Sequence, residues 1–311
     1  MTKSKRDNPA LAITCALIAV GLASTQDAIT KSMSGSYSAY ETVMFRCIGS
    51  LPVLLVLLWR SGGFAQLATP QLGSVILRSA LLCLGYFCFV LAIAAMPIAD
   101  AVAIYFTMPF FVAGLAGPLL GERVRPHRWL AIAAAFIGML IMVRPGAGVF
   151  EPASLFALLS ALSYAVGQMM GRPIAQTVSL PSIAMWQNVI YFAAAALMAL
   201  FFNSIEMPVF THKSMVFLSR PWVWPDLRDM AIFLGNGVLA AFAMVFFASA
   251  YKHAESSFVA PFEYSGMIWA VTYGYFIFGD FPGAATWTGG AIVIITGILM
   301  ILRDRQLDRA I

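Results

Sequence analysis

Ten runs of predominantly apolar residues take up most of this chain. They cover residues 9–28, 40–59, 72–95, 97–120, 127–144, 152–171, 181–202, 230–250, 256–278 and 283–302. About 20 helical residues cross the roughly 30 Å hydrocarbon core of a bilayer. Each run has about this length, and no soluble domain fits between them. The sequence therefore predicts an all-α integral membrane protein with ten transmembrane helices.

The composition excludes an ordinary soluble fold and several kinds of site. Of the 311 residues, 61% are hydrophobic and 11% are charged, whereas soluble domains carry about 25% charged residues. The net charge of +5 comes from residues scattered at the edges of apolar runs, which indicates membrane topology rather than a nucleic-acid interface. The four cysteines lie within apolar runs without metal-ligand spacing. We expect a membrane-lipid environment, no nucleic-acid partner and no metal site.

No enzymatic motif is present in the sequence. It lacks a GxxxxGK[ST] phosphate loop, a GxSxG nucleophile elbow and an HExxH zinc motif, and its three histidines lie outside the apolar runs. We therefore expect neither catalytic residues nor a bound cofactor. A membrane-embedded enzyme or a sensor remains the alternative from a different functional class. A sensor would usually carry a soluble output module.

The distribution of basic residues predicts the orientation of the chain. With the amino terminus inside, thirteen Lys and Arg residues, Arg78 among them, lie on the cytoplasmic side and five on the opposite side. Both termini are then cytoplasmic, and the segment 203–229 faces outward. Its Trp222 and Trp224 are typical of an interfacial anchor, and a lid over the pore is the less favoured alternative.

The chain also contains an internal repeat. Three residues that open one apolar run return 158 positions later, as Gly121, Glu122 and Trp129 and as Gly279, Asp280 and Trp287. The repeat divides the protein into two five-helix units, 1–148 and 149–311. Because each unit has an odd number of spans, the second must cross the membrane upside down. Inverted repeats are typical of secondary transporters that work by alternating access.

These segments resemble a known family. Gly121-Glu122-Arg123 with Trp129, Val143-Arg144-Pro145-Gly146, Ala260-Pro261-Phe262-Glu263-Tyr264, Trp269-Ala270 and Phe278-Gly279-Asp280 are similar to signature segments of the EamA branch of the drug/metabolite transporter (DMT) superfamily. The resemblance implies ten helices in the bacterial inner membrane, with spans 1 to 4 and 6 to 9 around a central cavity. Spans 5 and 10 would lie outside it and could support a homodimer. The position of Glu263 is often Arg or another residue in relatives, so a role for this carboxylate does not come from the family.

Glu263 is the leading candidate among the polar residues, because it lies about eight residues into the ninth run. A carboxylate in hydrocarbon is expensive, so it should face the bundle interior or a water-filled cavity. Recognition of a substrate amine and proton coupling are equally favoured, and a fixed pairing with a neighbouring helix is the alternative. Pro261 should break the helix here.

Arg46, about six residues into the second run, is the natural counter-charge. Its guanidinium fork suits a carboxylate of the substrate or of Glu263, and snorkelling to the interface is the equal alternative. Gln187 corresponds roughly to Arg46 in the internal alignment. Asp27 and Lys31 are expected to form a helical pair four residues apart at the outer interface, rather than a gate.

Further candidates share a polar or aromatic side chain within spans that should bound the cavity. They are Gln168, Asn188, Asn236, Tyr86, Tyr105, Trp186, Tyr264 and Trp269. Each could instead pack between helices. The sequence predicts a secondary transporter of small organic metabolites, with amino acids or related zwitterions as the first choice of substrate. Uptake of a planar cofactor such as riboflavin or S-adenosylmethionine, or multidrug efflux, is the alternative.

Overall fold

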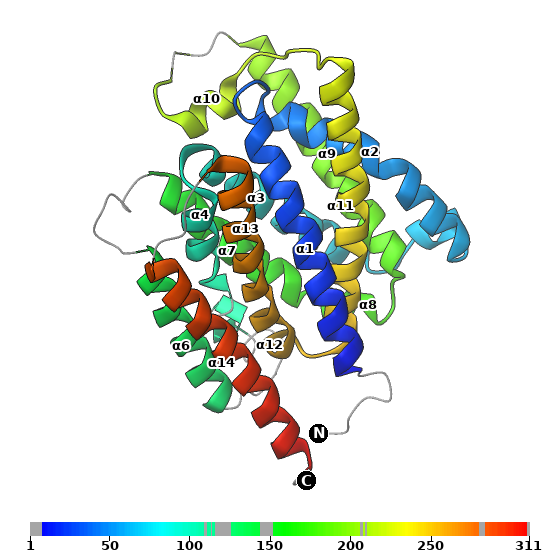
Figure 1. Ribbon diagram of the computed structural model, residues 1–311. Coiled ribbons are helices and arrows are strands. Elements are labelled where there is room, and N and C mark those ends of the chain that lie inside the picture. The colour runs from blue at the N-terminus through cyan, green and yellow to red at the C-terminus, as the bar shows by residue number, and fades with distance from the viewer. Residues whose placement is uncertain are drawn as a thin grey trace.

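The computed structural model describes residues 8–108, 111–112, 114–115, 126–143, 152–205, 208, 210–279 and 284–309. Within these ranges the secondary structure consists of helices and turns (Figure 1). The helices are α1 (Pro9–Met33), α2 (Ala39–Arg60), η1 (Phe64–Leu67), α3 (Leu72–Ala95), α4 (Ile98–Tyr105), α6 (Pro126–Val143), α7 (Pro152–Met169), α8 (Gly171–Ala175), α9 (Leu180–Ser204), α10 (Lys213–Ser219), α11 (Leu227–His253), α12 (Ser256–Val259), η2 (Ala260–Ser265), α13 (Gly266–Phe278) and α14 (Ala284–Arg309).

The helices follow the predicted apolar runs. In the described residues, six are long and apolar enough to cross a membrane: α1, α2, α3, the stretch Ala153–Ala175, α9 and α11. The prediction of an all-helical membrane protein is confirmed to this extent. The count of ten spans stays a prediction, and Gly121, Glu122, Arg144 and Asp280 lie outside the described residues.

Polar residues at the run edges set the helix starts. The side chain of Asn8 accepts a hydrogen bond from the Leu11 amide (3.1 Å), and α1 then begins at Pro9. Ser38 and Glu41 form a capping box at the start of α2, while Ser179 caps α9. Such caps satisfy amide groups that the helix itself leaves open. The apolar runs therefore become helices with defined first residues.

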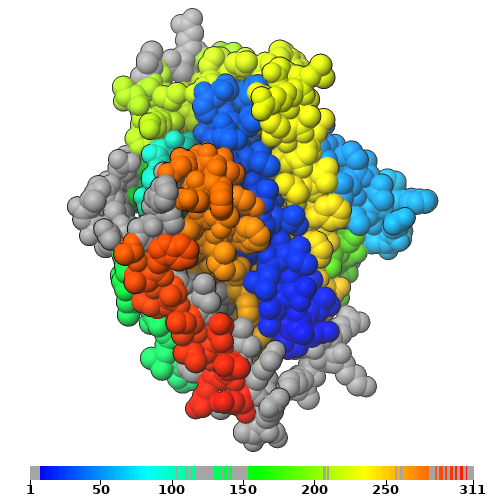
Figure 2. Space-filling model, in the orientation of Figure 1, coloured from blue at the N-terminus to red at the C-terminus, as the bar shows by residue number. Residues whose placement is uncertain are grey.

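The helices form a bundle with a lateral pair. In the bundle, α1 packs along α11, α3 along α7, and α2 along both α9 and α11. Figure 2 shows α1 in the seam between α13 and α11. The pair α6 and α14 lies at one side of the molecule, as the resemblance implies for spans 5 and 10 (Figure 1).

Two glycines allow the closest helix crossing. A Cβ at Gly49 of α2 would collide with the backbone of Leu234, and a Cβ at Gly237 of α11 would collide with the Arg46 carbonyl. Small residues at such crossings let membrane helices approach backbone to backbone. This crossing fixes the part of α2 that carries Arg46.

Residues 210–226, between α9 and α11, cover the end of the bundle opposite the chain termini (Figure 1). Ser214 Oγ donates to the Leu91 carbonyl (2.7 Å), and Arg220 Nη1 donates to the carbonyls of Ser34 (3.0 Å) and Tyr37 (3.2 Å). The Val223 amide donates to Glu41 Oε1 (2.7 Å). We call residues 210–226 the covering segment. It ties the ends of α1, α2 and α3 together.

Candidate functional site: a central polar cavity

A cavity of about 110 Å³ lies between the helices of the bundle. A water molecule needs about 10–15 Å³ measured in this way, so the cavity has room for several. Its lining comes from α1, α2, α3, α4, α7, α9, α11 and the η2–α13 region. Six predicted site residues line it, namely Arg46, Tyr86, Tyr105, Gln168, Gln187 and Glu263. Their role in binding stays a prediction.

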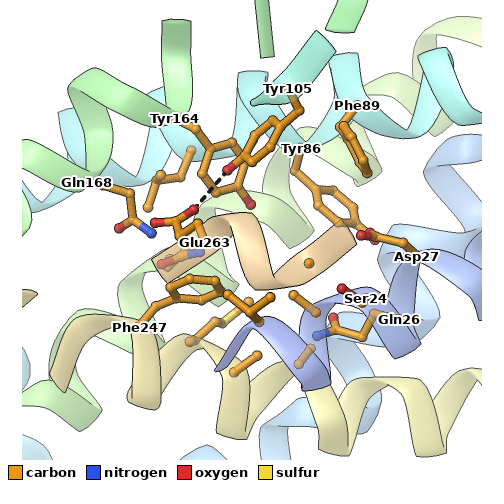
Figure 3. A pocket seen from close by; sticks show the side chains of 18 of the residues that line it. Ser24, Gln26, Asp27, Tyr86, Phe89, Tyr105, Tyr164, Gln168, Phe247 and Glu263 are labelled. Carbon is orange, nitrogen blue, oxygen red and sulfur yellow. Dashed lines mark hydrogen bonds between the residues drawn. The ribbon is translucent and has the colours of Figure 1, made fainter. Parts of the chain in front are cut away.

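Glu263 lies where the helical chain is interrupted. The break predicted at Pro261 is confirmed, because residues Ala260–Ser265 form a 3₁₀ turn between α12 and α13. The Glu263 side chain is buried. Tyr251 donates to its Oε1 (2.6 Å) and Tyr105 to its Oε2 (3.4 Å; Figure 3). Two tyrosines from different helices therefore hold the carboxylate at one end of the cavity.

Arg46 is buried in the cavity wall, and does not snorkel to an interface, with 3% of its surface exposed. Nη1 donates to Gln26 Oε1 (3.4 Å), while Nε and Nη2 have no hydrogen-bond partner within the described part of the chain. The guanidinium carbon lies 4.3 Å from the ring centre of Tyr86 and 5.0 Å from that of Tyr191. Aromatic faces stabilise a cation without consuming its N–H groups.

Arg78 was expected on the cytoplasmic side and instead lies in the same wall. It is 1% exposed. Nη1 donates to Gln187 (3.3 Å) and Nη2 to Gln168 (3.2 Å). Three helices, α3, α7 and α9, meet through this cluster. The signal was available, because Arg78 stands six positions after Leu72, the first residue of its helix.

Asp27 also lines the cavity, which differs from its expected place in an interfacial pair with Lys31. Lys31 Nζ donates to the Met96 carbonyl (2.9 Å). In Figure 3, Asp27 lies beside Tyr86 at the end of the cavity away from Glu263. The cavity thus has a carboxylate at each end. Spacing along α1 favoured the local pair, and only the arrangement of α1 against its neighbours places Asp27 inside.

Two tyrosines that the sequence did not single out complete the wall. Tyr164 and Tyr191 line the cavity, and the Tyr164 ring packs edge-on against Tyr105 (5.7 Å between ring centres). Tyr191 packs against Tyr86 (5.6 Å). Ring faces and phenolic hydroxyls give such a surface both apolar area and hydrogen bonds. The arrangement suits binding of an organic ligand that carries charge.

Four predicted site residues lie outside the cavity lining. Tyr264 packs edge-on against Phe106, and its hydroxyl donates to the Phe106 carbonyl (3.4 Å). Trp269 is 39% exposed and stacks on Tyr273. Trp186 Nε1 donates to the Leu67 carbonyl in η1 (3.1 Å). Asn236 is fully buried in α11, near the crossing with α2.

Asn188 also has a structural partner. Its side chain joins α9 to α2, since Nδ2 donates to the Cys47 carbonyl (3.1 Å) and Oδ1 accepts from Ser50 Oγ (2.6 Å). Interhelical hydrogen bonds of this kind are worth roughly 1 kcal/mol in membranes. The polar residues of the spans therefore divide into a group around the cavity and a group between helices.

Curated proteins similar to this chain are named as transporters. An S-adenosylmethionine uptake transporter of Rickettsia conorii is 25% identical over 290 residues, covering 93% of this chain and 92% of the relative. A riboflavin transporter of Rhizobium johnstonii is 28% identical, covering 88% and 82%. A pseudopaline exporter of Pseudomonas aeruginosa is 27% identical, covering 89% and 91%.

A solved structure and a family model extend over the same length. The crystal structure of a protein with 20% sequence identity superposes with a TM-score of 0.72, covering 96% of this chain and 99% of the other, and shows that the fold is shared. The model of the EamA-like transporter family matches residues 10–144 and 152–303. These two matched segments together span nearly the whole sequence. This chain therefore belongs to the EamA-like transporter family and is a membrane transporter of the drug/metabolite type.

Proposed function

We propose that this transporter moves a cofactor-sized organic solute with an aromatic ring system, and that S-adenosylmethionine is the first candidate. The observation that carries the proposal is the cavity itself, whose lining includes Asp27, Glu263, Arg46 and Arg78 together with tyrosine rings. Sulfonium and ammonium groups suit the carboxylates, a carboxylate suits a guanidinium, and adenine suits the rings. A relative named for S-adenosylmethionine uptake supports this choice.

Riboflavin is the second candidate. The relative from Rhizobium johnstonii is named for it, and the tyrosine faces suit an isoalloxazine ring. Riboflavin carries no charge at neutral pH and so leaves the four charged groups without a counterpart. The first expectation, a simple amino acid, gains no support from the relatives named above. The cofactor alternative is better supported.

The pattern of helix packing supports the predicted inverted repeat. Exchange of α1 with α7, α2 with α9, α3 with α11 and α4 with α13 maps packed pairs onto packed pairs. Thus α1 on α11 becomes α7 on α3, α2 on α11 becomes α9 on α3, and α1 on α13 becomes α7 on α4. Such an exchange is what a two-fold axis between units 1–148 and 149–311 requires, and it favours alternating access around the cavity.

Contacts between residues separated by either of two repeat offsets support the same repeat. Tyr105 contacts Glu263 and Phe106 contacts Tyr264, both across 158 positions, the offset of the repeated motif. Cys47 contacts Asn188 across 141 positions, the offset that relates Arg46 to Gln187. Residues that meet their own counterparts lie near a two-fold axis. The cavity would then lie on this axis.

Orientation and assembly belong to the same proposal. The start of α1 and the end of α14 lie at one end of the bundle (Figure 1). The excess of basic residues on that side supports a cytoplasmic location of both termini, in the inner membrane of a bacterium. The lateral pair carries exposed apolar residues such as Leu130 and Trp287, which suit lipid or a second copy in a homodimer.

The test is transport by the purified protein in proteoliposomes. Vesicles loaded with unlabelled S-adenosylmethionine or riboflavin receive the labelled compound outside, and counterflow is measured for each. We expect counterflow of S-adenosylmethionine, with a several-fold loss in Glu263→Gln. Leu155→Ala, at an exposed position of α7, is the matched control. Absence of counterflow for both compounds would refute the proposed function.

A further inference from the structure

We infer that Asp27, Arg46 and Tyr86 form a subsite for the amino-acid end of the substrate, with its ammonium on Asp27 and its carboxylate on Arg46 and Tyr86. This inference rests on the proposed function and deepens it, because it says which group of the solute binds where. It also moves recognition of the amine from Glu263, where the sequence placed it, to the opposite end of the cavity (Figure 3).

The unfilled donors of Arg46 are the first observation. Arg46 is only 3% exposed, and its Nε and Nη2 find no acceptor among the described residues. A buried guanidinium normally has its donors paired. Nε and Nη2 are adjacent on one edge of the fork, which is the edge that receives a carboxylate in bidentate pairs. Because Arg46 lines the cavity, the missing acceptor can arrive from there.

Tyr86 supplies a further donor at the same place. Its ring lies 4.3 Å from the Arg46 guanidinium carbon, and its buried hydroxyl has no partner in the described part of the chain. The buried Thr30 Oγ1 lies next to this hydroxyl, without a hydrogen bond of normal geometry. Several unsatisfied polar atoms around one wall of a cavity indicate a group that is bound there during the working cycle. A carboxylate has enough lone pairs to satisfy Arg46 and Tyr86 together.

Asp27 is the complementary acceptor. The Asp27 carboxylate interacts electrostatically with the positive charge of Arg46. Figure 3 shows Asp27 beside Tyr86. Glu263, by contrast, already accepts hydrogen bonds from Tyr251 and Tyr105. An incoming ammonium would have to displace these hydroxyl donors at Glu263. The Asp27 end of the cavity therefore suits a zwitterion, and the rest of the solute extends toward Tyr105, Tyr164 and Glu263.

Two nucleosides that differ only at this end provide the test. S-adenosylhomocysteine carries an α-amino-acid group on its thioether, whereas 5′-methylthioadenosine has a methyl group there. Each is measured as an inhibitor of S-adenosylmethionine counterflow and as a ligand in thermal shifts of the detergent-solubilised protein. We expect the wild type to prefer S-adenosylhomocysteine by about 10-fold or more, as charge-assisted hydrogen bonds allow. The preference should fall below about 3-fold in Arg46→Gln and in Asp27→Asn.

The controls separate this subsite from other effects. Glu263→Gln should keep the preference for S-adenosylhomocysteine over 5′-methylthioadenosine even where transport slows, because Glu263 lies at the end of the cavity away from Asp27. Equal binding of both nucleosides by the wild type, or an undiminished preference in Arg46→Gln, would overturn the inference. Counterflow of riboflavin with no thermal shift from either nucleoside would overturn the subsite but leave cofactor transport standing. Thermal shifts read the subsite even where no counterflow occurs.

Discussion

Arg46 and Arg78 are two buried guanidiniums in one cavity wall, and their surroundings differ in kind. Arg78 has both Nη groups bonded to glutamines, Gln168 and Gln187, from two other helices. Arg46 has one long bond to Gln26 and two unpaired donors, with tyrosine faces on its flanks. Arg78 leaves only Nε without a partner in the described residues, whereas Arg46 leaves both Nε and Nη2 open on one edge of its fork. Burial alone therefore does not distinguish a structural charge from a binding one; the satisfaction of its donors does.

The largest expected effect is loss of stability in Arg78→Met. Removal of the guanidinium leaves Gln168 and Gln187 without their donor, and each unsatisfied buried acceptor costs about 1–3 kcal/mol. We expect the free energy of unfolding to fall by about 2–5 kcal/mol. Chemical unfolding in detergent micelles measures it, with Arg46→Met as the matched variant. Arg46→Met should change stability by less than about 1 kcal/mol, since the lost cation–π contacts are offset by removal of two buried donors that have no partner among the described residues. Equal losses in the two variants would erase the distinction.

The next effect concerns transport in Arg46→Lys. Lysine keeps the charge but lacks the planar fork that receives both oxygens of a carboxylate. We expect counterflow of S-adenosylmethionine to fall by roughly 10-fold, which corresponds to about 1.4 kcal/mol, with unchanged thermal stability. Wild-type counterflow in this variant would mean that Arg46 acts only through its charge.

Asn236 sharpens the comparison between the two halves. It lies 158 positions after Arg78, and neither side-chain atom has a partner in the described ranges. If the two halves exchange conformations during transport, Asn236 takes the place that Arg78 has now. The hydrogen bonds of Arg78 to Gln168 and Gln187 then correspond to hydrogen bonds of Asn236 to Gln26 and Arg46. We expect Asn236→Leu to stabilise the present conformation by about 1–2 kcal/mol and to slow counterflow. Faster counterflow or lower thermal stability would contradict this pairing.

The smallest effect is expected at the α10 end of the bundle, where water can replace a lost hydrogen-bond partner. Tyr37 donates to Asp229 (2.6 Å), and this hydrogen bond raises the pKa of Tyr37 to about 12. A raised pKa means that the contribution of the bond to stability is complete below pH 10 and is lost as the pH rises through 12. Tyr37→Phe should lower the unfolding temperature slightly at pH 8 and have no effect above pH 12. A loss as large as that of Arg78→Met would show that contacts at the α10 end and contacts at the cavity do not differ as we infer.

The sequence predicted the helices well and the cavity in part. Apolar runs and edge caps such as Ser38 fix where helices begin, and Pro261 marks the interruption beside Glu263. The missed residues, Arg78 and Asp27, lie near helix ends, where hydropathy cannot distinguish a side chain that reaches water from one that turns inward. Trp186 and Trp269 were chosen by depth in their spans, but the rotation of a helix about its axis decides which face meets the cavity, and packing with neighbours sets that rotation.

The covering segment has a consequence for the dynamics of the α10 end. It is fastened by hydrogen bonds from Arg220 to the carbonyls of Ser34 and Tyr37 and from the Val223 amide to Glu41. Where water can replace the lost partner, breaking such a bond costs only about 1 kcal/mol net. Phe217 of the same segment is 2% exposed within the bundle core, and uncovering such a side chain costs about 1.5–3 kcal/mol more. An uncovered form of this end therefore has to expose Phe217 as well as break the hydrogen bonds, but it can form without melting a turn of α1 or α2.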